Sequence, residues 1–299
     1  MIRFIQGFLW ILLAVCVSCR KPSEGSATGA AAAPSTNRQV FQVKGIIQGV
    51  DAARREVVIK HEEVTGYMPA MTMPFEVHDT NELTGLRAGQ AVTFRLLVTE
   101  TEGWIDQVLA TPATNGPPQS VSLRRVKDVD SLGPGDRLPE YSLTNQFGQS
   151  FSTARFRGQA LAITFLFTRC PFPTFCPRMA ANFEETQRKL LASQHGPTNW
   201  QLLTISFDPE FDKPAVLKAY AEARNYDPGR WTFATGALID ITAIGEQFGL
   251  AFWRDQPGTI NHNLRTAVID AGGRVQKIFE GNDWTADELV SEMIAAAGK

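Results

Sequence analysis

Residues 160–179 read ALAITFLFTRCPFPTFCPRM. The apolar run at 160–167 predicts a strand, and a helix is predicted to begin at Pro177. Cys170 and Cys176 lie in the segment that joins them. A thiol close to a helix N-terminus feels the positive end of the helix dipole, which favours the thiolate form. Because thiolate is both a nucleophile and a metal ligand, this segment is predicted to be the working centre of the protein.

The sequence around this centre alternates between strand-like and helical stretches. Further strands are predicted over residues 201–207 and 266–270. Helices are predicted over residues 177–192, 213–224, 238–248 and 285–297. The last of them opens with Thr285-Ala-Asp-Glu288, which has the spacing of a capping box. Alternation of this kind implies an α/β fold, in which helices cover a sheet.

A different pattern occupies residues 40–110. Strand-like runs are separated by turn signals there, at residues 41–50, 56–61, 71–77, 91–98 and 104–109. Five strands in a segment of this length predict a small all-β domain, a five-stranded barrel of the OB type. A stretch rich in proline, glycine and polar residues follows, so residues 111–131 are predicted to be a linker and residues 132–299 the α/β domain.

The N-terminus has the features of an export signal. Arg3 precedes an apolar run at residues 4–18 that is too short for a comfortable transmembrane helix. The run ends at Cys19, placed as in a bacterial lipoprotein cleavage site, so residues 1–19 are predicted to be a signal peptide and Cys19 the lipidated residue. Residues 20–38 are predicted to be a flexible tether. An ordinary cleaved signal and an uncleaved anchor are the alternatives, and all three place the protein on the periplasmic side.

Composition narrows the class of protein. With 43% apolar and 10% aromatic residues, the 299-residue chain has enough apolar surface for one large core or two smaller ones. Its formal net charge of -2 lacks the basic excess of a nucleic-acid binder, so nucleic acid is excluded as a partner.

Cys170 and Cys176 are the only cysteines outside the predicted signal peptide. A structural disulfide is common in exported proteins, but a bridge closing so short a loop removes little entropy from the unfolded chain. Short-range cysteine pairs suit metal chelation and thiol–disulfide exchange instead. The pair is therefore interpreted as chemically active.

Several motifs of the α/β region resemble those of the SCO/SenC family. They are Gly135-Asp-Arg-Leu-Pro139, Phe165-Leu-Phe-Thr-Arg-Cys170, Cys176-Pro177, Ser206-Phe-Asp-Pro-Glu-Phe-Asp212 and Asn261-His-Asn263. The resemblance implies a thioredoxin-like fold and a copper site formed by Cys170, Cys176 and His262. It also implies a role in assembling the copper centre of cytochrome c oxidase, so a subunit of that enzyme, or another cuproprotein, is the expected partner.

The cysteine spacing departs from that of the family, which usually has three residues between the cysteines. Here residues 171–175 separate them, and two of these are prolines that limit the freedom of the loop. Two thiolates and an imidazole suit Cu(I) and tolerate Cu(II), although zinc also accepts such ligands. The acidic motif of Asp208, Glu210 and Asp212 is interpreted as a solvated turn and helix cap at least as readily as a group near the metal.

A second candidate metal site lies in the all-β region, where residues 66–75 read GYMPAMTMPF. Met71 and Met73 alternate along a predicted strand, so their thioethers leave the same face, and His61 ends the preceding strand. Thioethers are soft, neutral ligands that suit Cu(I). Core filling explains one or two such methionines. Three within six residues, beside a histidine, favour a metal site.

This segment resembles the small periplasmic copper-binding domain of bacterial silver and copper efflux systems, a five-stranded barrel. The resemblance implies His61, Met71 and Met73 as ligands. Where that family has a tryptophan over the metal, this chain has Met68, which is therefore a candidate third sulfur ligand.

Two copper motifs on one exported chain favour a metallochaperone, in which the methionine domain acquires Cu(I) and the SCO-like domain delivers it. The alternative is a thiol–disulfide oxidoreductase, in which Cys170 and Cys176 reduce the cysteines of a target copper site. The two differ in their need for His262, which exchange does not require. A peroxidase on the same fold is disfavoured, because nothing near Cys170 supplies the threonine and arginine constellation of such enzymes.

Overall fold

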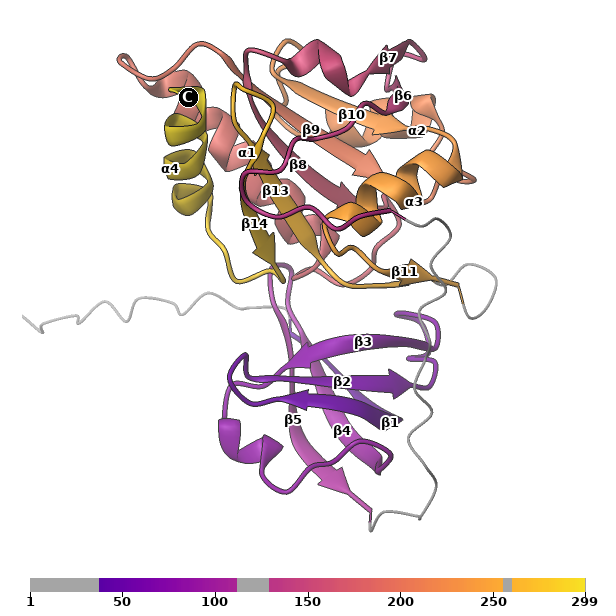
Figure 1. Ribbon diagram of the computed structural model, residues 1–299. Helices are drawn as coiled ribbons and strands as arrows, with labels where there is room; N and C mark the ends of the chain where they lie inside the picture. The colour runs from indigo at the N-terminus through magenta and orange to yellow at the C-terminus, as the bar shows by residue number, and fades with distance from the viewer. Residues whose placement is uncertain (1–37, 112–128, 255–259, 299) are drawn as a thin grey trace, which may run out of the picture. The chain divides into compact units, whose positions relative to one another are not determined.

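The computed structural model describes residues 38–111, 129–254 and 260–298 (Figure 1). Every element below belongs to one compact unit, Thr36–Lys299. This unit contains a five-stranded sheet, a seven-stranded sheet and a two-stranded ribbon. The predicted signal peptide with Cys19, nearly all of the predicted tether and most of the predicted linker lie outside the described residues.

The five-stranded sheet forms the β region, residues 39–110. Its strands are β1 (Gln39–Asp51), β2 (Glu56–His61), β3 (Met71–Glu76), β4 (Ala91–Val98) and β5 (Gly103–Ala110). They are ordered β3-β2-β1-β4-β5, and every neighbouring pair is antiparallel. Each predicted strand is present, and β2 and β4 have the predicted bounds.

The expected closed barrel is not found among the described strands. β3 and β5 form the two edges of the sheet, and only an isolated bridge between Val77 and Ile105 is recorded across them. β3 carries Pro74, which has no backbone N–H to donate and is typical of an edge strand. The β region is therefore a five-stranded sheet whose edges approach each other without forming a ladder.

The seven-stranded sheet lies in the α/β region, residues 129–298. Its order is β14-β13-β8-β9-β10-β6-β7. The strands are β6 (Ser142–Asn145), β7 (Ser150–Ser152), β8 (Ala160–Leu166), β9 (Trp200–Ser206), β10 (Trp231–Thr235), β13 (Arg265–Ile269) and β14 (Val275–Glu280). β8, β9 and β10 are parallel, whereas the outer pairs are antiparallel. Every residue of β8 is buried, as expected of a central strand covered on both faces.

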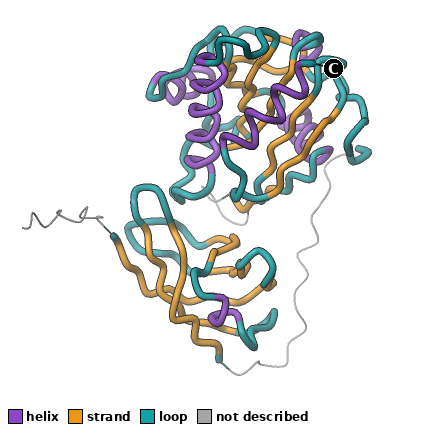
Figure 2. Tube along the Cα trace, turned by 90° about the vertical axis from the view of Figure 1, so that its left-hand side faces the viewer, coloured by secondary structure: helices purple, strands orange, loops and turns teal. Residues whose placement is uncertain are grey.

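Helices cover both faces of this sheet (Figure 2). One hydrophobic cluster joins α1 (Cys176–Ala192), α2 (Pro214–Glu222) and α4 (Ala286–Ala297) to one face, and another joins α3 (Leu238–Gln247) to the opposite face. The helices agree with the prediction to within two residues at each end. The predicted capping box at Thr285 and Glu288 is present. Among the described residues, no helix has both the length and the apolar character needed to cross a membrane.

The topology places the C-terminal end of β8 beside a small ribbon. In this ribbon, β11 (Phe252–Trp253) pairs with β12 (Asn261–His262), with Phe252 opposite His262. Because β13 follows directly and pairs with β8, the histidine reaches the same end of the sheet as the cysteines. The fold thus brings the neighbouring cysteine pair together with a histidine that lies 86 positions after Cys176 in the sequence.

Glu56, at the start of β2, gives a prediction about stability. Burial, followed by the nearby Asp283, raises the pKa of this carboxyl from 4.5 to about 7. A carboxyl with a raised folded-state pKa destabilises the fold increasingly as pH rises from 4.5 to 7, and by a constant amount above that. Allowing for its partial exposure, Glu56→Gln is expected to raise the free energy of unfolding by about 1–2 kcal/mol at about pH 8 and by nothing at about pH 4.

Urea unfolding at both pH values measures this difference. Glu100→Gln, at an exposed position, is the control and should leave stability unchanged at either pH. An equal effect of Glu56→Gln at the acidic and the alkaline pH would show that ionisation of Glu56 is not responsible.

Candidate metal centres

The first centre is built on the cysteine loop, residues 167–175, which joins β8 to α1. Cys176 is the first residue of α1, and Pro177 occupies its first turn, where a missing N–H costs nothing. The loop turns back on itself, because the N–H of Cys170 donates to the Phe167 carbonyl at 3.3 Å and that of Phe175 to the Phe172 carbonyl at 3.1 Å. The five intervening residues therefore do not hold the cysteines apart.

The structure brings Cys170, Cys176 and His262 together. One ligand atom from each, two sulfurs and an imidazole nitrogen, lie within 4.8 Å of one another. The Cys176 Sγ is 3.7 Å from the His262 Nε2. Both cysteines are free thiols, Cys176 is fully buried and Cys170 is half-buried. The three side chains face one small volume, as expected of a site for a soft metal ion.

His262 is held as a neutral imidazole. Its Nδ1 lies 3.2 Å from the Ile260 carbonyl, and because a carbonyl only accepts, Nδ1 carries the proton and Nε2 presents its lone pair to the cysteines. Burial lowers the pKa of His262 to about 4. Aromatic rings surround the imidazole: those of Phe167, Phe175 and Phe207 have centroids 5.1–5.7 Å from its own. The ligand is thus fixed in orientation and does not become protonated near neutral pH.

The two thiols differ in acidity. Burial opposes ionisation of Cys170, but hydrogen bonds from the side chain and backbone of Cys176 outweigh it and lower the pKa of Cys170. Burial and the neighbouring Cys170 raise the pKa of Cys176 well above its ordinary value. The expectation of a favoured thiolate therefore holds for Cys170 alone. This more exposed residue is the one suited to act as a nucleophile or to bind an incoming metal first.

An ion-pair network that no sequence motif predicts lies beside the cysteine loop. The buried carboxylate of Asp208 accepts from Arg169 at 2.7 Å and from Arg254 at 2.6 Å. Burial tends to raise the pKa of Asp208, but the two guanidinium groups lower it overall. The network ties the cysteine loop to β9 and to the ribbon that carries His262. Arg254 gave no sequence signal, because its pairing depends on the fold.

Asp212 and its neighbours correct the interpretation of the acidic motif as a solvated turn. Asp212 is fully buried and accepts hydrogen bonds from the hydroxyls of Ser206 and Thr168 and from the Thr168 N–H. Burial nevertheless raises the pKa of Asp212. Glu210 alone is solvent-exposed, with 82% of its side chain accessible. Asp208 and Asp212 therefore hold the cysteine loop in place through their contacts with Arg169 and Thr168.

The second centre is the methionine cluster, which we define as His61, Met68, Met71 and Met73. Pairing of β2 with β3 sets His61 opposite Met71 and Ile59 opposite Met73, so the predicted alternation and the position of the histidine are confirmed. All four side chains are at least nine-tenths buried. Met68 joins them from the preceding turn, where its backbone bridges to Val64.

His61 distinguishes this cluster from an ordinary apolar core. Its Nδ1 lies 2.6 Å from the Glu62 carbonyl, so Nδ1 carries the proton and Nε2 is the acceptor. The Nε2 is buried and has no hydrogen-bond partner among the described residues. Burial lowers the pKa of His61, so the imidazole stays neutral. An unpartnered buried acceptor is costly, and a soft cation between this nitrogen and the thioethers would satisfy it.

Comparison with known proteins found two family models. The model "SCO1/SenC" matches residues 130–298, and the model "Copper binding periplasmic protein CusF" matches residues 40–109. The SCO1 protein homolog of Bacillus subtilis is 27% identical over 161 residues, covering 52% of this chain and 81% of the relative. The mitochondrial SCO2 homolog of Mus musculus is 24% identical over 220 residues, covering 70% of this chain and 80% of the relative.

Solved structures gave similar matches. A SCO1/SenC family lipoprotein from Bacillus anthracis is 29% identical with a TM-score of 0.49, over 54% of this chain and 95% of the other. Copper-bound yeast Sco1 is 22% identical with a TM-score of 0.46, over 56% of this chain and 90% of the other. The SCO1/SenC match confirms the thioredoxin-like class expected for the α/β region. Because that model covers more than half of the chain, the protein belongs to the SCO1/SenC family.

Proposed function

We propose that this protein is an extracytoplasmic copper metallochaperone. The observation that carries the proposal is the convergence of two free thiols and a neutral imidazole within 4.8 Å. Three soft or borderline ligands hold Cu(I) and tolerate Cu(II). Copper is the cargo of the site, received and passed on without being consumed.

We further propose that the recipient is a cytochrome c oxidase subunit with a copper centre, or another cuproprotein. Family membership supports this assignment, since relatives in the same family include the SCO1 and SCO2 homologs. The half-buried Cys170 gives a partner access to one ligand of the site, while Cys176 and His262 stay enclosed. A recipient thiolate can thus replace the ligands one at a time, beginning with Cys170.

The methionine cluster is proposed as a second Cu(I) site. The unpartnered Nε2 of His61 and the buried thioethers beside it support this, as does the match of residues 40–109 to a periplasmic copper-binding family. Neutral ligands favour Cu(I) over divalent ions and do not oxidise to disulfides. The same match supports a location on the periplasmic side, and the export signal and lipidation of Cys19 predicted from the sequence support a lipid anchor there.

A second function, thiol–disulfide exchange, is favoured by the unequal acidity of the two thiols. The pKa of Cys170 is lowered and the residue is half-buried, whereas the pKa of Cys176 is raised and the residue is enclosed. That is the arrangement of an attacking thiol with a resolving partner behind it. In this role the protein would reduce an oxidised cysteine pair in the recipient and itself become a disulfide.

Copper analysis with X-ray absorption tests the metallochaperone directly. The reduced full-length protein is expected to bind one Cu(I) at each centre, with sulfur ligands outnumbering nitrogen ligands at both. Copper K-edge spectra give the oxidation state and the ligand count, and metal analysis gives the stoichiometry. A protein that takes up no copper when reduced, or that binds it only through oxygen and nitrogen, would contradict the proposal.

A further inference from the structure

The two candidate centres lie in one compact unit and are joined by specific contacts. The Tyr67 hydroxyl donates to the Pro171 carbonyl of the cysteine loop at 3.1 Å. The backbone N–H of Thr72 donates to Oδ1 of Asn261. Thr72 lies between Met71 and Met73, and Asn261 directly precedes His262. Both residues of this second hydrogen bond are therefore immediate sequence neighbours of candidate copper ligands.

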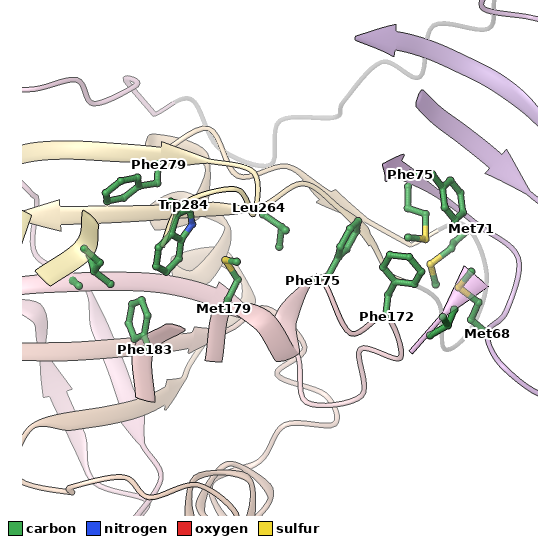
Figure 3. Close-up of a cluster of buried hydrophobic side chains, with 14 of the residues drawn as sticks. Met68, Met71, Phe75, Phe172, Phe175, Met179, Phe183, Leu264, Phe279 and Trp284 are labelled. Carbon is green, nitrogen blue, oxygen red and sulfur yellow. The ribbon is translucent and has the colours of Figure 1, made fainter. Parts of the chain in front are cut away.

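Phe172 is the centre of this contact. It belongs to the cysteine loop, yet its ring is 2% exposed and packs edge-on against Phe75 of β3 with 6.0 Å between centroids. Figure 3 shows the ring pointing toward Met68 and Met71. Gly103 of β5 makes room for it, because a Cβ atom there would lie 2.6 Å from the Phe172 Cζ. The residues between the cysteines thus include one that inserts into the β region.

The methionine cluster is enclosed at this contact, and so are two of the three residues of the first centre, whereas Cys170 is half-buried. His61, Met71 and Met73 are 2%, 8% and 3% exposed, and Cys176 and His262 are 0% and 7% exposed. A soluble chelator or an external protein has no direct route to the methionine cluster in this arrangement. Copper held there can leave in two ways, either by separation of the contact or by passage to the adjacent cysteines.

We propose that the β region and the cysteine loop form an intramolecular handover interface, in which Phe172 closes the methionine cluster and Cu(I) passes from it directly to Cys170 and Cys176. This rests on the proposed function of both centres. During transfer the bonds from copper to the thioethers and to His61 break, and bonds to the two sulfurs and to His262 form. Copper remains Cu(I), and the two thiol protons leave to solvent, so no oxidant or reductant is required. Anionic thiolate binds Cu(I) more strongly than neutral thioether, which sets the direction.

The rate at which bathocuproine disulfonate removes Cu(I) tests whether Phe172 closes the methionine cluster. The parent protein is the full chain with Cys170→Ser and Cys176→Ser, so that copper is held at the methionine cluster alone. Adding Phe172→Ala is expected to speed removal about tenfold or more, because the buried phenylalanine ring stabilises the closed contact and its loss favours the open form. Phe172→Leu, which keeps apolar volume, is expected to have a smaller effect. Phe147→Ala, at a 49% exposed phenylalanine, is the control and should change nothing.

The possible results distinguish a failure of the proposed interface from a failure of the proposed copper site on which it rests. A parent protein that holds no Cu(I) contradicts the methionine site itself. A parent that holds Cu(I) and releases it at the same rate as its Phe172→Ala and Phe172→Leu derivatives overturns the closure. The Leu substitution keeps the test decisive if Phe172→Ala does not fold.

Transfer between chains tests the handover. The Cu(I)-loaded parent is the donor, and copper-free reduced protein with Met71→Leu and Met73→Leu is the acceptor. Appearance of ultraviolet Cu(I)–thiolate absorption reports arrival at the cysteines. Exchange from the closed donor is expected to be at least about tenfold slower than exchange from a donor that also carries Phe172→Ala, because copper without cysteines in its own chain leaves only when the contact separates. Equal rates from the two donors would show that the contact does not control the path of copper and would overturn the proposal.

Discussion

Replacing Cys170 by Ser is expected to abolish tight copper binding at the cysteine–histidine centre. Each ligand of a structural metal site contributes on the order of 3–4 kcal/mol, so loss of one thiolate should weaken Cu(I) binding about 10²–10³-fold. The substitution is nearly isosteric and Cys170 is half-buried, so the fold should tolerate it. Competition with a chromophoric Cu(I) chelator measures the change in affinity. In the same assay the methionine cluster should keep its own equivalent of copper.

His262→Ala separates the two proposed activities. It removes one ligand and is expected to weaken copper binding about 10²-fold or more while leaving both thiols free to cycle between dithiol and disulfide. His195→Ala, at an exposed histidine, is the matched control and should alter neither property. Unchanged copper affinity in both Cys170→Ser and His262→Ala would remove the basis of the metallochaperone and leave exchange as the function.

The sequence predicted the elements well where local pattern and packing agree. The apolar run at 160–167 became a central strand covered on both faces, and the helix after it begins within one residue of the predicted position. The period-two placement of Met71 and Met73 was enough to put both on one face, because strand pleating is a local property. Barrel closure was not predictable in this way, since it depends on how two edge strands meet across the sheet.

Relations between distant segments could not be predicted from the sequence. Asp208 looks like a solvated acid in its own motif, and only the fold brings Arg169 and Arg254 to it. The packing of Phe172 against the β region was even less predictable, because in the sequence it is one of several apolar residues of the loop. Its role depends on Gly103, which lies on a strand of the other large sheet, far earlier in the chain.

Replacing Met71 and Met73 together by Leu is expected to abolish Cu(I) binding at the methionine cluster while preserving the fold. Met and Leu have similar volumes, so the exchange of two buried side chains should cost less than about 1.5 kcal/mol each. Loss of both thioethers leaves His61 and Met68 as the only donors of the cluster, which is expected to weaken Cu(I) binding by about 10²-fold or more. Chelator competition measures the affinity, and thermal unfolding without metal measures the stability.

Met293→Leu in α4 is the matched control, because it makes the same chemical change at a fully buried methionine outside the methionine cluster. It should leave the copper equivalent of the methionine cluster in place. Cu(I) should also raise the thermal unfolding temperature of the Met293→Leu protein but have a smaller effect on the double variant, since a ligand stabilises only the state that binds it. If the double variant keeps the full Cu(I) affinity of the native chain, the methionines serve only to fill the core. The buried Nε2 of His61 would then need another partner to explain its position.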